Sequence, residues 1–152
     1  KEGYGIIANT LHSDGRYKDI LYVNGGVSST GTIGHVKMQG RDVFKHAVEK
    51  LASAMDEVLR LSNLTSQDID WLIPHQANIR IINAMQKKLN LPNEKVIKTV
   101  SHHANTSAAS IPLALTSGVE SGKIKSGHLL ALEAIGGGLS WGASLIRYGR
   151  PV

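Results

Sequence analysis

Hydrophobic and polar residues follow two different periods along the first part of the chain. Residues 5–12 mix β-branched and apolar side chains and end at the turn-forming Ser13-Asp14-Gly15, which predicts a strand. Residues 19–40 are rich in Gly, Ser and Thr without helical spacing, which predicts a long loop. From Asp42 onward the apolar spacing becomes helical and predicts an amphipathic helix. Its apolar face consists of Val43, Phe44, Ala47, Val48, Leu51, Met55 and Val58.

The rest of the chain alternates short apolar runs with helical segments. Residues 65–68 have the outline of a capping box and predict a single helical turn. The other predicted elements are a strand over 71–74, a helix over 78–89, a strand over 96–100, a helix from Thr106 or Ser107 to near Gly122, and strands over 128–135 and 139–148 that flank Gly136-Gly137-Gly138. Pro112 falls inside the predicted third helix, which makes the start of that helix uncertain.

This order, β-α-β-α-β-α-β-β, predicts an α/β fold with a five-stranded mixed sheet and helices on both faces. The short final connection indicates one antiparallel strand in a sheet that is otherwise parallel. We expect one domain over residues 1–152, with the 19–40 loop inside it.

Three loops that carry polar or Gly-rich sequence follow successive predicted strands. His75 follows the second strand, Asn105 the third, and Gly136-Gly137-Gly138 the fourth. In such a sheet, ligands bind outside the carboxyl ends of the parallel strands, so we expect the three loops to open onto one edge. A neutral imidazole and a carboxamide can both donate hydrogen bonds to one oxygen anion, and glycines allow backbone N–H groups to approach a substrate closely. The pattern favours an anion-stabilising site.

Each of these residues also has a purely structural interpretation. Beside Pro74, His75 could be a capped or core histidine, and Asn105 could be a helix cap. The three glycines could form only a hairpin connection. The adjacent His102 and His103 have no supporting ligand pattern, so we expect no metal site. The glycines of the long loop lack the spacing of a nucleotide-binding motif.

Composition narrows the possible functions. The chain has 152 residues, a formal net charge of +5 and no cysteine, which excludes a disulfide framework and a thiol nucleophile within this chain. We expect a cytoplasmic protein without a membrane partner, because the sequence shows neither a signal peptide nor a long apolar run. The basic charge alone is compatible with an acidic protein, a phosphorylated cofactor or a nucleic acid.

Three longer motifs identify a family. Residues 71–80, WLIPHQANIR, resemble the HQAN signature of β-ketoacyl-ACP synthase III. Residues 103–112, HANTSAASIP, are similar to its H-(G/A)-N-T-S-A-A-S segment, and residues 133–142, EAIGGGLSWG, resemble its Gly-rich terminal hairpin. The three motifs occur in the family's order, and the similarity extends over essentially the whole chain. We therefore interpret the chain as the C-terminal half of a thiolase-like condensing enzyme.

The resemblance implies a reaction and a role for particular residues. The family joins acyl-CoA to malonyl-ACP by decarboxylative Claisen condensation to begin fatty acid biosynthesis, and uses a Cys-His-Asn triad. His75 and Asn105 match the residues that stabilise the enolate, and Gly137 matches the backbone N–H of the oxyanion hole. The positions that match CoA-, pantetheine- or ACP-binding residues are Gly40, Phe44, Ala77, Asn78 and Arg80. The resemblance implies no metal or other cofactor and no nucleic-acid partner.

The nucleophilic cysteine of the resemblance has no counterpart here and is expected on an absent N-terminal half. We therefore predict that this chain alone does not catalyse condensation, and that the full-length enzyme is a homodimer. Arg41 and Ile135 depart from the family's common Asn and Phe, which leaves a CoA contact and the surroundings of the cysteine open. For Glu133 we expect a structural or network role. Two alternatives remain: a non-catalytic acyl-carrier- or CoA-binding domain, and a related condensing enzyme that makes polyketides or quinolones.

Overall fold

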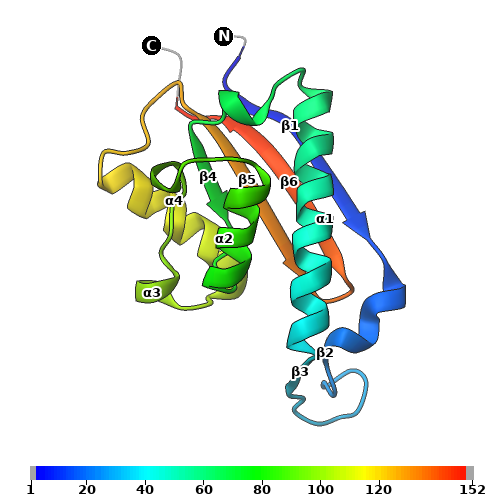
Figure 1. Ribbon diagram of the computed structural model, residues 1–152. Helices are drawn as coiled ribbons and strands as arrows, with labels where there is room; N and C mark the ends of the chain where they lie inside the picture. The colour runs from blue at the N-terminus through cyan, green and yellow to red at the C-terminus, as the bar shows by residue number, and fades with distance from the viewer. Residues whose placement is uncertain (1–2, 150–152) are drawn as a thin grey trace.

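The computed structural model describes residues 3–149 and contains one main sheet with helices on both faces (Figure 1). The strands of this sheet are adjacent in the order β1-β6-β5-β4. They span Gly5–Ser13 (β1), Trp71–Pro74 (β4), Leu129–Gly136 (β5) and Ser140–Arg147 (β6). β4 pairs with β5 in parallel, whereas β6 is antiparallel to both β5 and β1. Therefore β1, β4 and β5 run in one direction and only β6 is reversed, as the short final connection predicts.

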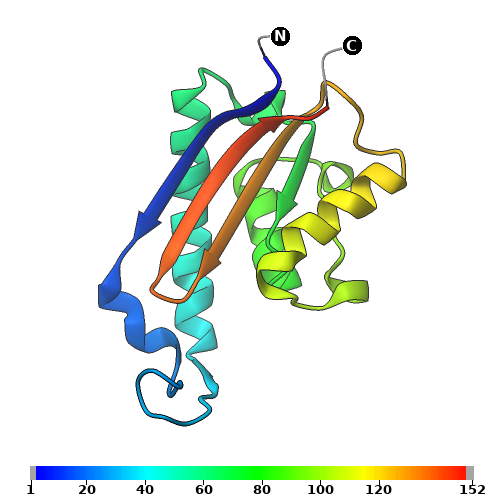
Figure 2. The same ribbon diagram turned by 180° about the vertical axis from the view of Figure 1, so that it is seen from behind.

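Helices cover the two faces of the sheet unequally. The principal helices are α1 (Gly40–Leu61), α2 (Ile79–Lys88), α3 (Val100–His103) and α4 (Ser110–Glu120), and the 3-10 helices are η1 (Gly15–Ile20), η2 (Ser66–Asp68), η3 (Asn93–Lys95) and η4 (Ser107–Ala109). α1 and α2 pack on one face, and α4 packs on the other, over β4 and β5 (Figures 1 and 2). Figure 2 shows β1 and β6 without a helix in front of them on the α4 side.

Alternating side chains of the central strand β5 build the two cores. Leu129 and Ala131 belong to the cluster with α1 and α2, whereas Leu130 belongs to the cluster with α4. All three side chains are almost completely buried. This alternation follows from the period of two along a strand, and the double burial explains why β5 reads as a nearly continuous apolar run.

Local capping agrees with the sequence. In η2, Asp68 Oδ2 accepts a hydrogen bond from the Thr65 backbone N–H at 2.8 Å, which confirms the predicted single turn. Asn78 caps α2: its Oδ1 accepts a hydrogen bond from Arg80 N–H at 2.8 Å. Pro112 occupies the third position of α4, within the first turn, where its missing N–H removes no intrahelical bond.

The predicted strand over 96–100 is wrong. Only one bridge forms there, between Val96 and Leu72, and the chain then turns into α3. The reason is the side chain of Gln76, whose Oε1 accepts hydrogen bonds from Thr99 N–H at 2.8 Å and Val100 N–H at 3.1 Å. These donors are bound by the carboxamide, and the main sheet therefore has four strands instead of the predicted five.

The predicted loop over 19–40 is also more ordered than its composition suggests. It begins at the end of η1 and contains the paired strands β2 (Leu21–Val23) and β3 (Val36–Met38), which form a two-stranded antiparallel sheet. Strands of three residues are too short to show an alternating pattern in the sequence. The hairpin extends beyond the N-terminal end of α1 at the lower edge of Figure 1.

Large apolar side chains are exposed on β1 and on this hairpin. Leu11 of β1 is 83% exposed and Ile6 is 67% exposed, while Val27 and Ile33 at the hairpin tip are each 89% exposed. Exposed apolar side chains in such numbers are typical of a face that another protein segment covers.

Candidate functional site

A large groove opens at the carboxyl ends of β4 and β5 and continues along β6 and β1. Its volume is about 1660 Å³, and its walls come from the sheet, the start of α1, the β2–β3 hairpin and the turn before α4. Seven of the predicted site residues line it: Gly40, Phe44, His75, Ala77, Asn78, Asn105 and Gly137. The structure therefore brings the three predicted loops together at one edge of the sheet.

His75 follows β4 directly and is held at two points. Its backbone N–H donates to the Glu133 carbonyl at 2.8 Å, which extends the pairing of β4 with β5 by one residue. Its ring Nδ1 lies 2.6 Å from the Ser110 Oγ. Burial lowers the pKa of His75 below the ordinary value, because a partly desolvated imidazolium is less stable than in water. At neutral pH the ring is therefore uncharged.

The side chain of Gln76 links the backbone around His75 to the segment before α3. It is completely buried, and its Nε2 donates to the carbonyls of Pro74 at 2.8 Å and Ile97 at 3.2 Å. Its Oε1 accepts from the chain at the start of α3, as described above. This one carboxamide therefore ties the end of β4 to the segment that leads to Asn105.

Asn105 lies in a turn between α3 and η4 that uses left-handed backbone on both sides. Ala104 has φ of 56° and Ser107 has φ of 53°. Asn105 Oδ1 accepts a hydrogen bond from the Ser107 backbone N–H at 2.9 Å. The carboxamide oxygen is thus engaged within the turn, and the amide NH₂ is the group with donor capacity left for the groove.

Gly137 lies immediately after β5, against the β2–β3 hairpin. A Cβ atom at this position would lie 3.0 Å from the Leu21 carbonyl oxygen. The two backbones approach closely, so a side chain at this position would require the Leu21 carbonyl to move by a few tenths of an ångström.

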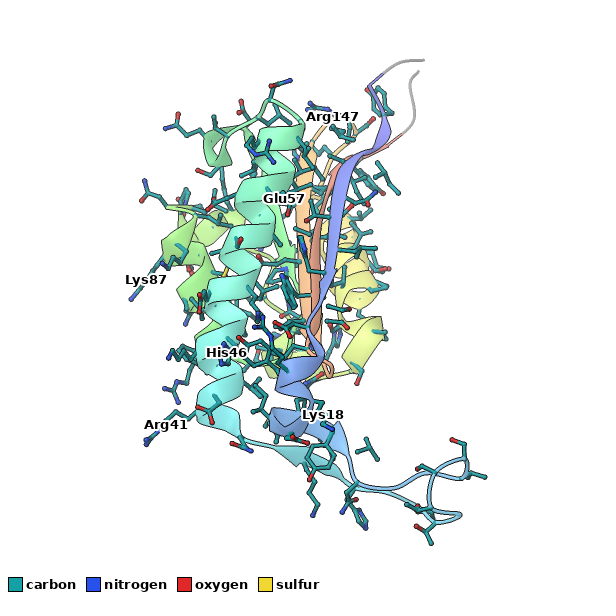
Figure 3. All side chains as sticks on the ribbon, turned by 90° about the vertical axis from the view of Figure 1, so that its right-hand side faces the viewer. Lys18, Arg41, His46, Glu57, Lys87 and Arg147 are labelled. Carbon is teal, nitrogen blue, oxygen red and sulfur yellow. The ribbon has the colours of Figure 1, made fainter. Side chains whose placement is uncertain are left out.

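Arg80 is the predicted site residue that does not line the groove. Its guanidinium carbon lies 5.3 Å from the centroid of the Phe44 ring, within the range of a cation–π interaction. Phe44 does line the groove, so Arg80 lies at its border. Lys87 and Arg41 point outward from α2 and from the start of α1 (Figure 3).

Ser110 and Glu133 are more closely involved in the site than the sequence alone indicates. Ser110 is 1% exposed and contacts both His75 and Gln76. Glu133 lines the groove, yet its carboxyl oxygens are buried and have no hydrogen-bond partner among the described residues. Burial raises the pKa of Glu133 to about 8. Both residues lie inside the quoted motifs, but only the fold shows which side chains face the site.

Residues 3–149 contain no group of three or more His, Cys, Asp or Glu side chains arranged to hold a metal ion. In the same residues, no helix combines the length and the apolar character needed to cross a membrane.

Comparison with known proteins shows the family of the chain. The family described as "3-Oxoacyl-[acyl-carrier-protein (ACP)] synthase III C terminal" matches residues 59–148. The Beta-ketoacyl-[acyl-carrier-protein] synthase III of Sphingopyxis alaskensis is 59% identical over 143 residues, which cover 94% of this chain and 44% of the relative. That of Erythrobacter litoralis is 55% identical over 147 residues, covering 97% of this chain and 46% of the relative. The chain therefore spans somewhat less than half the length of these relatives.

Solved structures of related enzymes also superpose on this chain. The 3-oxoacyl-[acyl-carrier-protein] synthase III of Aquifex aeolicus superposes with a TM-score of 0.88 at 40% identity, over 97% of this chain and 46% of that one. The priming β-ketosynthase of the R1128 polyketide pathway superposes with a TM-score of 0.90 at 28% identity, over all of this chain and 47% of that one.

Proposed function

This chain belongs to the family of C-terminal domains of 3-oxoacyl-[acyl-carrier-protein] synthase III, and on that premise we propose that it is the C-terminal half of such an enzyme. The proposed reaction condenses acyl-CoA with malonyl-ACP and begins fatty acid biosynthesis. The observation that carries the proposal is the meeting of His75, Asn105 and Gly137 in one groove at the carboxyl ends of the strands.

In this proposal, a cysteine thiolate attacks the acyl-CoA carbonyl, the C–S bond to CoA breaks, and CoA leaves as the thiolate, which takes a proton from water. Malonyl-ACP then loses CO₂, and the electron pair of the broken C–C bond forms an enolate whose negative charge develops on the thioester oxygen. His75 and Asn105 donate hydrogen bonds to that oxygen. A donor of this kind is worth about 3 kcal/mol of transition-state stabilisation in a site that excludes water. In its neutral state His75 still carries one ring N–H, so it can donate one hydrogen bond to the enolate oxygen.

The enolate carbon next attacks the acyl-cysteine. A C–C bond forms, the C–S bond breaks, and the cysteine thiolate leaves as the β-ketoacyl-ACP is produced. The backbone N–H of Gly137 stabilises the oxyanion on the acyl carbonyl in this step. Gly40, Phe44, Ala77 and Asn78 all line the groove. In the proposal, the first two lie along the path of CoA and the last two lie near the pantetheine arm.

Arg80 is proposed to dock the acidic carrier protein. It lies at the border of the groove against Phe44, and Lys87 and Lys88 extend the positive charge to the end of α2. We further propose a cytoplasmic, homodimeric enzyme that needs no metal or other cofactor and binds neither nucleic acid nor membrane.

The nucleophile must come from another segment, because the 152 residues contain no cysteine. Exposed apolar residues of β1 (Ile6, Leu11) and of the paired strands β2 and β3 (Tyr22, Val23, Val36, Met38) line the same groove. Among residues 3–149 no helix covers this side of β1 and β6 (Figure 2), and this is where we place the N-terminal half. Alone, the chain is proposed to be inactive in condensation.

Complementation tests the proposal. The N-terminal half of a relative, which carries the cysteine, is mixed with this chain, and β-ketoacyl-ACP is measured from acyl-CoA and malonyl-ACP. We expect product from the mixture, none from either half alone, and a loss of at least about 100-fold in His75→Ala. His102→Ala, which changes an exposed histidine outside the groove, is the matched control and keeps the activity. Binding of ACP without turnover in any mixture would instead favour a non-catalytic binding domain.

A second candidate is a condensing enzyme of polyketide biosynthesis. It is favoured by the TM-score of 0.90 to the R1128 priming β-ketosynthase over the whole chain. The chemistry assigned to His75 and Asn105 is the same in both candidates, so the acyl chain of the condensation product, determined by mass spectrometry, distinguishes them.

A further inference from the structure

Ser110 lies in an unusual position for a serine at the start of a helix. Its side chain is 1% exposed, so water does not compete for it, and its Oγ contacts two groups in the described part of the chain. One is the backbone N–H of Gln76 at 3.1 Å, and the other is Nδ1 of His75 at 2.6 Å. Every hydrogen bond of this hydroxyl is therefore directed at the β4 end of the site.

The direction of these two bonds follows from the chemistry of the partners. The Gln76 N–H can only donate, so the Ser110 oxygen accepts from it. The hydroxyl hydrogen then needs an acceptor, since a buried donor without a partner loses the hydrogen bond that it would make to water. His75 Nδ1 is the acceptor that the described residues offer. A nitrogen that accepts carries no proton, so the proton of the neutral ring is on Nε2.

We propose that Ser110 holds His75 as the Nε2–H tautomer and so provides the groove with a hydrogen-bond donor at that position. Ser110 is in this sense a positioning residue for the enolate-stabilising role proposed above, on which the functional part of this inference rests. The same turn orients the second donor, because the Ser107 N–H occupies Asn105 Oδ1 at 2.9 Å. One short segment, residues 105–110, thereby sets the donor direction of both groups.

The tautomer can be measured on this chain without any catalytic assay. Histidine labelled with ¹⁵N is incorporated, and two-bond ¹H–¹⁵N correlations report which ring nitrogen carries the proton near pH 7. We expect an unprotonated Nδ1 and a protonated Nε2 at His75. A protonated Nδ1 in the unmodified chain would overturn the proposal.

A matched pair of substitutions isolates the hydroxyl. Ser110→Thr keeps the hydroxyl, and Ser110→Val replaces it by a methyl group of similar shape. Removing the donor destabilises the neutral ring, so in Ser110→Val we expect the pKa of His75 to rise by about half a unit to one unit. Ser110→Thr keeps the lower pKa. The control is Ser101→Ala, which removes the exposed hydroxyl 3.0 Å from His102 Nδ1 and leaves His75 unchanged.

The effect of Ser110 on catalysis is tested in the enzyme reconstituted from this chain and the N-terminal half of a relative. We expect Ser110→Val to lower kcat by about 10-fold to 100-fold, as removal of a group that orients a histidine does, with KM little changed and with recovery in Ser110→Thr. Unchanged kcat in Ser110→Val would overturn the positioning role. If the unsubstituted mixture has no condensing activity, the proposed function fails, while the NMR result still decides the tautomer.

Discussion

The buried carboxyl group of Glu133 makes a quantitative prediction about stability and pH. Both of its oxygens are without partners in the described structure, and the neighbouring strand residues Pro74 and Ala143 offer no charge. Burial raises its pKa from 4.5 to about 8. Glu133 therefore keeps its proton in the native state at neutral pH, as buried carboxyl groups without a charged partner do.

The sign of the effect follows from proton binding. Below pH 4.5 the group is protonated in both native and unfolded states and contributes no pH dependence. Between pH 4.5 and 8 the unfolded chain releases the proton and the native chain keeps it, so the free energy of unfolding falls as pH rises. At about 1.4 kcal/mol per unit of pKa, the full loss is about 5 kcal/mol. This is comparable to the whole stability of a small domain.

Urea unfolding at pH 5 and pH 8 measures this loss, and Glu133→Gln isolates it. The carboxamide has nearly the same shape and does not titrate, so we expect the free energy of unfolding of the variant relative to the unmodified chain to rise by several kcal/mol from pH 5 to pH 8. The control Glu94→Gln, at an exposed position in η3, leaves the pH dependence intact. The lowered pKa of His75 acts in the opposite direction and is common to all three proteins, so it cancels in the comparison.

The protonation of Glu133 can also be measured directly. The carboxyl carbon of Glu133, followed by ¹³C NMR, is expected to titrate near pH 8. A midpoint near 4.5, together with equal pH dependence in Glu133→Gln and the unmodified chain, would refute the reasoning. It would mean that water or another group stabilises the carboxylate in the native state.

Three further predictions concern packing and assembly. Gln76→Ala removes four side-chain hydrogen bonds and leaves buried backbone groups unpaired, so urea unfolding is expected to show a loss of about 3 kcal/mol or more. Gly137→Ala brings a Cβ to 3.0 Å from the Leu21 carbonyl, and we expect at least about tenfold slower condensation in the complemented enzyme, whereas an unchanged rate would contradict the tight approach. The exposed apolar surface predicts self-association of the isolated chain in sedimentation velocity, weakened about tenfold or more by Leu11→Lys; a monodisperse monomer would count against it.

Elements with a clear apolar period were predictable from the sequence. The face of α1 from Val43 to Val58, the buried strand β4 and the final pair β5–β6 all match the predicted spacing. The convergence of the loops after β4 and β5 follows from strand direction alone, as the general rule for such sheets predicts. In these regions local pattern and tertiary packing agree, so the sequence is a sufficient guide.

Two sequence-based predictions of secondary structure are wrong, for different physical reasons. The apolar run at 96–100 has the composition of a strand, but the carboxamide of Gln76 binds the N–H groups that a strand would pair. A pattern of apolar residues contains no information about such a long-range bond. The β2–β3 hairpin fails for a different reason, because its strands are too short for any period to be visible.

These irregular segments are also the ones that form the site. Asn105 lies in a turn bounded by left-handed residues, and Gln76 and Ser110 bind the chain around His75 through side-chain hydrogen bonds. A regular ladder would bind the backbone groups of this segment along its whole length and would leave no freedom to aim two donors at one groove. The replacement of ladder bonds by buried side-chain bonds therefore both ends the predicted third strand after a single bridge and orients the imidazole and the carboxamide. The same physical arrangement explains the mistaken strand and the geometry of the site.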